Sequence, residues 1–307
     1  MKNTIIAIFS TISLLFLNIN TSSAFDSDKP LSLTLKYGAS KQDVMYRTPI
    51  ANSILTWSSD NIDLGTDLEI RLSPEIFANI EYNYSKVKGG SSTDDDIENG
   101  YGAFSWHGVN GQTHDVKISL GYKHNYSDKT SIIPLIGIFH KEVEVESSYG
   151  SANYESDFSS FEVLAESVNK YSGVSIGAQL QRKLNNEAKF NLRIDYLIPL
   201  IYSSNNIWYG RDPDLYWNMK NSRDYNKGDF GARIKSELGF KVANNAIIDY
   251  IKLYAFYEYI QVKGLIEEGG QGSSMPNYAI DGRNCSECLS EGVTKFEAFG
   301  AGIAVEF

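Results

Sequence analysis

One acidic stretch of this sequence has the residue types and spacing for acid–base chemistry. The segment "GGSSTDDDIENG" carries four carboxylates within twelve residues: Asp94, Asp95, Asp96 and Glu98. Two carboxylates that share a water molecule are one way to build a hydrolytic site. Acidic clusters flanked by Gly and Ser are also typical of solvated turns. The fold around the stretch has to decide between these two interpretations.

The first residues have the features of a secretory signal peptide. Lys2 provides a basic start, and "IIAIFSTISLLFL" is an apolar run too short to span a bilayer. Small residues at the cleavage position follow in "SSA", which ends at Ala24. We therefore expect residues 1–24 to be removed and residues 25–307 to be exported as a single domain. No later segment is long and apolar enough to be a transmembrane helix.

The composition excludes some partners. A net charge of -10 argues against nucleic acid. The two cysteines, Cys285 and Cys288, lie three positions apart in "NCSEC", and in an exported chain we expect them to form a local disulfide. A metal site would need further ligands, and no histidine lies near them. The mean hydropathy of -0.28 is compatible with a membrane β-barrel, whose strands are apolar on one face only.

Apolar and polar residues alternate along segment after segment, which is the period of a β-strand. In "KFNLRIDYLIPL", Leu192, Ile194 and Tyr196 share one face, while Arg193 and Asp195 share the other. The same period recurs in residues 64–72, 116–122, 230–240, 251–259 and 297–307.

The connections between these segments alternate in length. Short turns are expected at 73–74, 127–128, 184–186 and 243–245, and long polar loops at 47–50, 88–111, 150–161, 203–226 and 264–292. About ten strands, tight turns on one side, long loops on the other and a terminal Phe307 are typical of an outer-membrane barrel. A soluble β-sandwich would show similar alternation and is the alternative.

Two consequences follow for a barrel of this size. Its lumen is too narrow for a porin-like channel and should be filled by side chains, with salt bridges between the inward charges. Several strands also exceed the roughly 9–11 residues that cross the hydrocarbon. The surplus must project beyond the membrane, and we expect function at the long-loop end.

The sequence resembles a known family at this point. The segments "SLTLKYGASKQDVMY", "KGGSSTDDD", "NNIWYGRD" and "VANNAIIDYIKLYAFYEYIQVKG" fall in the order and spacing of the omptins. These are ten-stranded outer-membrane endoproteases of Gram-negative bacteria, and the resemblance covers the whole mature chain. It implies a water activated between an Asp-x-Asp pair and an Asp-x-His dyad on opposite walls, without a metal or a covalent intermediate. It also implies selection of basic residues and dependence on bound lipopolysaccharide.

The family's catalytic positions carry over only in part. The Asp-x-Asp pair falls on Asp94 and Asp96, but the dyad positions are Asn206 and Trp208. Asn cannot carry the charge that stabilises an imidazolium, and indole has no basic nitrogen. The resemblance therefore predicts half of a protease site. The family's substrate-binding carboxylate of the first strand aligns with Gln42 or, with a shift of one residue, with Asp43.

Three functions are open from the sequence. The first is an omptin-like surface protein with reduced or lost peptidase activity, which acts by binding or adhesion. The second is an active endoprotease in which His107 or His114 replaces the missing base. The third is a structural or small-solute barrel. The aromatic residues of the fourth long loop either shape its rim or bind surface carbohydrate or a host protein: Trp208, Tyr209, Tyr216 and Trp217.

Overall fold

The structure is a computed structural model of the whole chain. It describes residues 30–48, 53–96, 104–147, 149–154, 157–161, 165–209, 216–224, 229–242, 247–271, 279–280, 283–284 and 288–307. At the long-loop ends of several strands, including Asp94–Asp96 and Asn206–Tyr209, the structure describes the backbone and not the side chains. The chain divides at Pro30, and the unit Leu31–Phe307 is described below.

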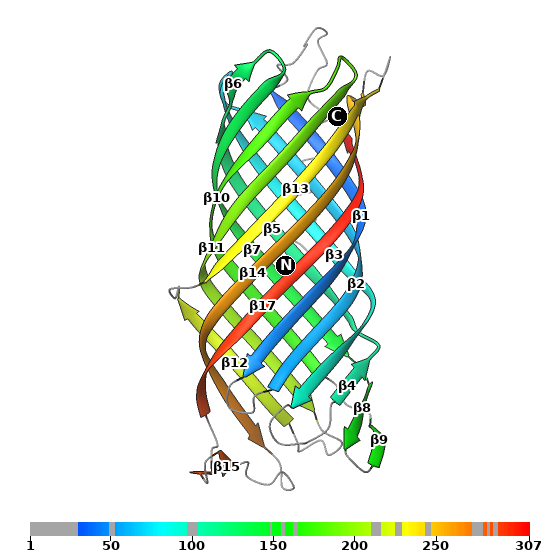
Figure 1. Cartoon of the computed structure of the whole chain (residues 1–307), viewed down its shortest axis with the longest axis vertical. Helices are drawn as coiled ribbons and strands as arrows, with labels where there is room; N and C mark the ends of the chain where they lie inside the picture. The colour runs from blue at the N-terminus through cyan, green and yellow to red at the C-terminus, as the bar shows by residue number, and fades with distance from the viewer. Residues whose placement is uncertain are drawn as a thin grey trace. The chain divides into compact units, whose positions relative to one another are not determined.

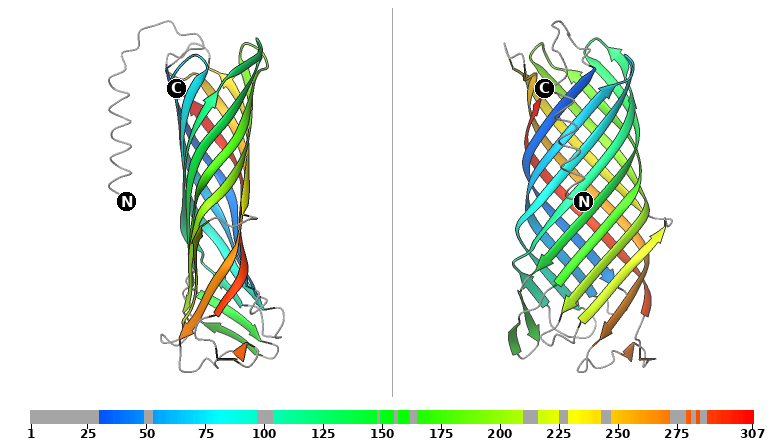
Figure 2. Two further views of the ribbon diagram at one scale, coloured as in Figure 1. Left: turned by 90° about the vertical axis from the view of Figure 1, so that its left-hand side faces the viewer. Right: turned by 180° about the vertical axis from the view of Figure 1, so that it is seen from behind.

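Ten of the described strands close into an antiparallel barrel. In chain order they are β1 (Leu31–Thr48), β2 (Ser53–Arg71), β3 (Ile76–Asp96), β5 (Asn110–Tyr122), β7 (Thr130–Ser147), β10 (Ala165–Lys183), β11 (Ala188–Tyr209), β13 (Phe230–Lys241), β14 (Tyr250–Gln271) and β17 (Cys288–Glu306). The first strand pairs with the last, Tyr37 opposite Ile303, so the barrel has no open edge. In Figure 1 the blue β1 lies beside the red β17, and Figure 2 shows the same oblique strands from behind. The predicted ten-stranded barrel is confirmed. In the described part of the chain, no helix has the length and apolar character to cross a membrane.

Alternation along each strand separates an apolar outer face from a polar lumen. Ile194 and Tyr196 of β11 are half exposed, whereas Arg193 and Asp195 between them are buried. The predicted faces are confirmed in this strand and in β13 and β14. A soluble protein rarely exposes so many large apolar side chains, so this outer surface suits a lipid environment. The long-loop half of the outer surface is more polar, as in the exposed ion pair of Lys41 with Asp60 at 3.8 Å.

The short turns end the strands by side-chain capping. The Ser73 hydroxyl accepts hydrogen bonds from the backbone N–H of Glu75 (3.3 Å) and Ile76 (3.0 Å). The Asn185 carbonyl oxygen accepts from the N–H of Glu187 (2.8 Å) and Ala188 (2.7 Å). Such local bonds fix tight turns at one end of the barrel, shown at the top of Figure 1.

The strands extend into regions where the sequence predicts loops. β3 continues to Asp96, and its long-loop end adds β4 (Phe104–His107), β8 (Tyr149–Tyr154) and β9 (Asp157–Phe161) in one hydrogen-bonded series. β12 (Tyr216–Asp224) pairs with β11 and β14 on the long-loop side of β13, so β12 and β13 form one interrupted wall strand. Two further short pieces, β15 (Ala279–Ile280) and β16 (Arg283–Asn284), pair with each other, and β6 (His124–Ser127) pairs with β7. The predicted loop boundaries were wrong here because polar residues on both faces hide the strand period outside a membrane.

Candidate functional site

The long-loop end of β3 carries the predicted carboxylate pair. In the β2–β3 ladder, Asp94 lies opposite Leu55 and Asp96 lies opposite Ser53. Ser92, two positions earlier, is fully buried on the lumen side. Positions 94 and 96 continue that side of the strand at its period of two. From Gly89 to Asp96 the acidic stretch is therefore part of strand β3 and does not form a free turn.

The opposite wall carries the two positions at which the dyad is replaced. Asn206 of β11 lies opposite Ser167 of β10, which is buried, and Trp208 lies opposite Ala165. β5, β7 and β10 separate β3 from β11 on one side of the barrel, and β2, β1, β17, β14 and β12 separate them on the other. The backbone of Asp94 and of Asn206 thus lies on facing walls, at the same end of the lumen.

At the predicted substrate-binding position of β1, the side chain that faces the lumen is an amide. Gln42 is buried, and its side-chain oxygen accepts a hydrogen bond from the Thr113 hydroxyl at 2.9 Å. Asp43 lies on the other face of β1, opposite Ser58 and Glu297 of the two neighbouring strands. The lumen group here is therefore neutral, and a substrate-binding role of Asp43 stays a prediction.

The histidine side chains that the structure describes lie away from the lumen. His114 is on the outer face of β5, where its Nδ1 is 2.9 Å from the Tyr82 hydroxyl and its ring packs against Tyr84. His140 contacts Ser172 on the outer face at 2.7 Å, and His124 belongs to the short-turn end. The backbone of His107 lies in β4 opposite Ser91. His114 consequently cannot act as a base between the two walls.

Between these positions and the middle of the barrel, the lumen is filled by aromatic and hydroxyl side chains. Tyr46 of β1 reaches across to β10, where its hydroxyl lies 2.7 Å from the Ser167 hydroxyl. The Tyr202 hydroxyl lies 3.2 Å from the side-chain oxygen of Asn169 and 3.0 Å from the Thr294 hydroxyl. The core cluster around these bonds contains fifteen buried residues: Val44, Tyr46, Trp57, Val87, Val109, Phe139, Val143, Val145, Tyr171, Leu197, Tyr202, Ile260, Val262, Phe296 and Ala298. This cluster, called the plug below, closes the lumen under the long-loop end.

Two buried groups beside the carboxylate positions have no hydrogen-bond partner. Trp57 and Ser92 lie directly opposite each other on β2 and β3, and each is at most 1% exposed. The indole Nε1 and the Ser92 hydroxyl are both unsatisfied. Unsatisfied buried polar atoms are rare in folded proteins, so each needs an explanation.

The middle of the lumen is crossed by ion pairs. Arg233 of β13 contacts Asp115 of β5 and Glu258 of β14, and Lys141 of β7 contacts Glu258 at 2.8 Å. A second group joins Arg193 with Glu81 and Asp195, and Lys117 with Asp195, and a third runs through Lys36, Asp67, Lys235, Glu237, Lys252, Glu306 and Lys189. The predicted salt-bridged lumen is confirmed. A cavity of about 60 Å³ between the ion pairs and the plug is lined by Gln42, Asp63 and Lys141 among others.

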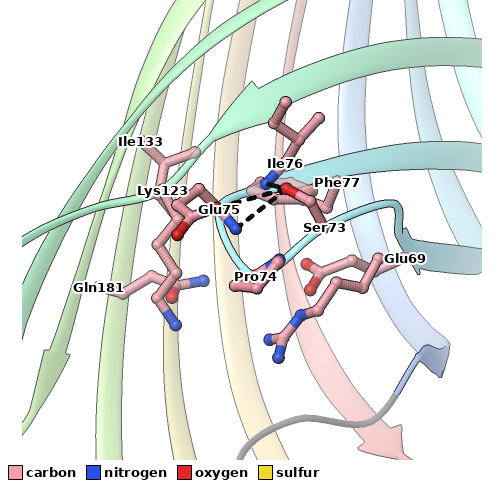
Figure 3. Close-up of a pocket in the computed structure, with 10 residues that line it drawn as sticks. Glu69, Ser73, Pro74, Glu75, Ile76, Phe77, Lys123, Ile133 and Gln181 are labelled. Atoms are coloured by element: carbon pink, nitrogen blue, oxygen red, sulfur yellow. Dashed lines mark hydrogen bonds between the residues drawn. The ribbon is translucent and has the colours of Figure 1, made fainter.

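A small pocket at the short-turn rim is too small to bind a substrate. It lies over the β2–β3 turn, between Glu69, Arg71 and Lys123, and Figure 3 shows Ser73 among its lining residues with the turn's hydrogen bonds. Its volume of about 10 Å³ accommodates roughly one water molecule.

The described residues provide no support for a transition-metal site or for thiol chemistry. No group of three or more His, Cys, Asp or Glu side chains in this part of the chain could hold a metal ion. Cys285 lies outside the described residues, and the backbone of Cys288 begins β17 opposite Glu268. The disulfide between them stays a prediction.

Sequence reasoning missed the residues that form the floor of this site. Trp57, Ser92 and Ser167 were not selected, since each stands in a polar segment without a motif. The inward frame of β2 could have found Trp57, which is in step with Asp63 and Asp67. Ser167 could have been selected only with knowledge of the β10–β11 register, which places it opposite Asn206.

The alignment with a solved structure, OmpT, agrees with the fold. No protein-family model and no curated protein matches the sequence. Among solved structures, the outer membrane protease OmpT from Escherichia coli aligns with a TM-score of 0.73 and 12% identity, over 94% of this chain and 100% of that chain. The toluene transporter TodX from Pseudomonas putida aligns with a TM-score of 0.39 and 9% identity, over 91% of this chain and 90% of that one. The outer membrane protein OprG from Pseudomonas aeruginosa reaches 0.34 at 8% identity, over 91% and 97%.

The class of protein follows from the fold. A closed antiparallel barrel of ten strands, with an apolar outer face and a charged lumen, has the architecture of an outer-membrane β-barrel. OmpT aligns over nearly the whole chain, and at 12% identity the likeness is one of fold.

Proposed function

We propose that this chain is an omptin-like barrel of the outer membrane that binds a ligand at its long-loop end, with endopeptidase activity at basic residues reduced or lost. One observation carries the proposal. Asp94 and Asp96 stand on one wall, but the positions across the lumen are Asn206 and Trp208. The retained pair therefore has no acid–base partner at the positions that the omptin arrangement uses.

The chemical argument concerns the base. Attack of water on a peptide bond near neutral pH needs a group that accepts a proton close to that pH. Histidine supplies such a group, whereas Asn and Trp do not. A positioned general base contributes roughly 10²–10⁴-fold to rate. We expect cleavage to be slower than in an active omptin by at least this factor.

A displaced histidine gains little support from the structure. His114 faces outward against Tyr82, and His140 faces outward against Ser172. His107 stays open as the base of an active enzyme, because its backbone lies in β4 close to the end of β3. An active endoprotease is therefore the outcome that the experiment below has to exclude.

The location in the cell is part of the proposal. The leader sequence in residues 1–24 supports export, and the apolar outer face supports insertion into the outer membrane. The long strands support a long-loop end that projects to the cell surface, since β14 has 22 residues and about 9–11 cross the hydrocarbon. Lipopolysaccharide as an associated lipid rests on the omptin resemblance, and a host or surface polypeptide would be the partner.

The test is cleavage of a dibasic fluorogenic peptide by the refolded barrel with lipopolysaccharide. We expect the natural chain to be inert or nearly so, and N206D with W208H to raise cleavage. D94A in the same background should abolish the gain, and K41M on the exposed outer face should leave it unchanged. Cleavage by the natural chain at the rate of an active omptin, abolished by H107A, would establish the enzyme instead.

A further inference from the structure

The cavity of about 60 Å³ between the ion pairs and the plug is lined by polar groups that are only partly satisfied. Three of its lining residues carry a buried atom without a hydrogen-bond partner: Asp63 Oδ2, Gln42 Nε2 and Asp115 Oδ1. Each of these residues is less than a tenth exposed. Unsatisfied buried polar atoms are rare in folded proteins, and three of them around one cavity point to a polar ligand inside it.

Asp63 of β2 differs from the other charged residues that line this cavity. In the part of the chain that the structure describes, it forms no ion pair, and its one side-chain hydrogen bond comes from the neutral Ser40 hydroxyl at 2.9 Å. The other charged lining residues all have a partner of opposite sign: Lys36 and Lys235 with Asp67, Glu81 with Arg193, and Lys141, Arg233, Asp115 and Glu258 with one another. A buried carboxylate is costly unless a positive charge compensates it.

Neutral oxygen atoms lie around the Asp63 carboxylate. Ser85 of β3 is directly opposite Asp63 in the β2–β3 ladder. On the other side, Tyr254 of β14 has its hydroxyl against Gly38, the residue of β1 that pairs with Asp63. Ser40, Ser85 and Tyr254 all line the cavity. A carboxylate among neutral oxygen ligands suits a hard cation.

The charge and the size of the cavity limit which cation fits. One unpaired carboxylate balances one positive charge, and the lysine and arginine side chains of the same wall oppose a second one. The volume of about 60 Å³ holds a small ion with a few waters and excludes a large organic cation. Waters bound to the ion can accept from the Gln42 Nε2–H and donate to Asp115 Oδ1, which satisfies both atoms.

We propose that this cavity binds a small monovalent cation, sodium or potassium, with Asp63 as its charged ligand. Ser85 and Tyr254 supply neutral oxygens, and water completes the coordination. Because the plug and the ion pairs close the lumen on both sides, the ion is enclosed when the barrel folds and stabilises the folded state. The site lies inside the barrel wall, so this inference goes beyond the binding function at the long-loop end and does not depend on it.

The experiment measures the stability of the refolded mature chain against sodium concentration. Sodium chloride replaces N-methylglucamine chloride at constant total salt, so that general screening does not change. An ion that binds only the folded state raises stability with its concentration. We expect the urea midpoint of the natural chain to rise with sodium, and the same series with potassium shows which ion the cavity prefers.

Two matched variants assign the effect to Asp63. D63N keeps the shape of the side chain and removes its charge, so its urea midpoint should not respond to sodium. In glucamine buffer D63N should be at least as stable as the natural chain, because an uncompensated buried charge is removed. D60N changes the exposed outer face of the same strand and should keep the full sodium response. Heat-modifiable migration on gels verifies that each variant is folded.

Equilibrium dialysis against radioactive sodium provides the direct measurement. Protein refolded in sodium should retain the ion in the natural chain and in D60N, and D63N should retain none.

Several outcomes would overturn the proposal. They are equal midpoints of the natural chain in sodium, potassium and glucamine, an undiminished sodium response in D63N, or a response to calcium alone. An infrared band of a protonated carboxyl group that D63N loses would show that a proton, and not a metal ion, neutralises Asp63. Peptide cleavage tests the proposed function separately, since neither result changes the other.

Discussion

Arg233 holds two carboxylates from different walls of the barrel. It contacts Asp115 of β5 and Glu258 of β14, and all three side chains are less than a tenth exposed. A buried ion pair is weak evidence for net stabilisation, but removal of one partner leaves the other charge without compensation. Individual lumen charges are therefore coupled to the stability of strands far apart in the sequence.

We expect R233M to destabilise the barrel by about 3–5 kcal/mol, the range found when one partner of a buried pair is removed. The measurement is the urea midpoint of the refolded protein, followed by gel migration or fluorescence. K41M is the control, because Lys41 and Asp60 form an exposed pair at 3.8 Å, and such pairs contribute about 0–1 kcal/mol. Equal midpoints for R233M and the natural chain would show that Lys141 alone compensates both carboxylates.

At the scale of elements, the wall between β11 and β14 is built from two strands. The β11–β12 pairing ends at Ile201 with Asp224, and the β11–β13 pairing begins at Leu197 with Gly231. Residues 198–200 of β11 face this interruption. The backbone N–H of Lys263 there donates to the buried Asp229 carboxylate at 2.8 Å, so a side chain replaces a missing ladder bond.

We expect D229A to lower the free energy of unfolding by about 1–3 kcal/mol, the cost of an unsatisfied buried backbone group. The same urea titration measures it, and D128A in an exposed turn should change stability by less than about 0.5 kcal/mol. A change in D229A no larger than in D128A would mean that water satisfies Lys263 at the interruption.

The sequence predicts the barrel elements where one face is apolar and the other polar. Ile194 and Arg193 identify β11 and its faces without a structure, because lipid and lumen impose opposite preferences on neighbouring residues. Beyond the apolar outer face this contrast disappears. The extension of β3 through Ser92 to Asp96, and the series β4–β8–β9, were therefore not predictable from the period.

The resemblance predicts site positions along the chain, whereas their arrangement in space comes only from the structure. The resemblance selected Asp94 and Trp208 as opposed positions, and the register places their backbones on facing walls. It could not show that Gln42 rather than Asp43 faces the lumen, since a shift of one residue reverses the face of a strand. Trp57 and Ser92 become a pair only through the β2–β3 register.

For the whole molecule, two layers close the lumen in series. The plug fills the long-loop half, where Tyr46 bridges opposite walls to Ser167, and the ion pairs around Arg233 fill the middle. The cavity between them, about 60 Å³, has room for only a few water molecules. A hydrated ion or a sugar would have to displace both layers to pass.

We therefore expect no solute flux through this barrel. Liposomes that contain the refolded protein should not swell in isotonic arabinose, and planar bilayers should show no conductance steps above the lipid background. A general porin, reconstituted in the same lipid, verifies that the assay detects flux. Because the plug and the ion pairs close the lumen independently, the single substitutions R233M and Y46A should each leave the barrel non-conducting, whereas the double variant opens both layers and should conduct. Steps in the natural protein would contradict a filled lumen and restore the small-solute barrel as its function. Conductance in either single variant would show that one layer alone forms the seal.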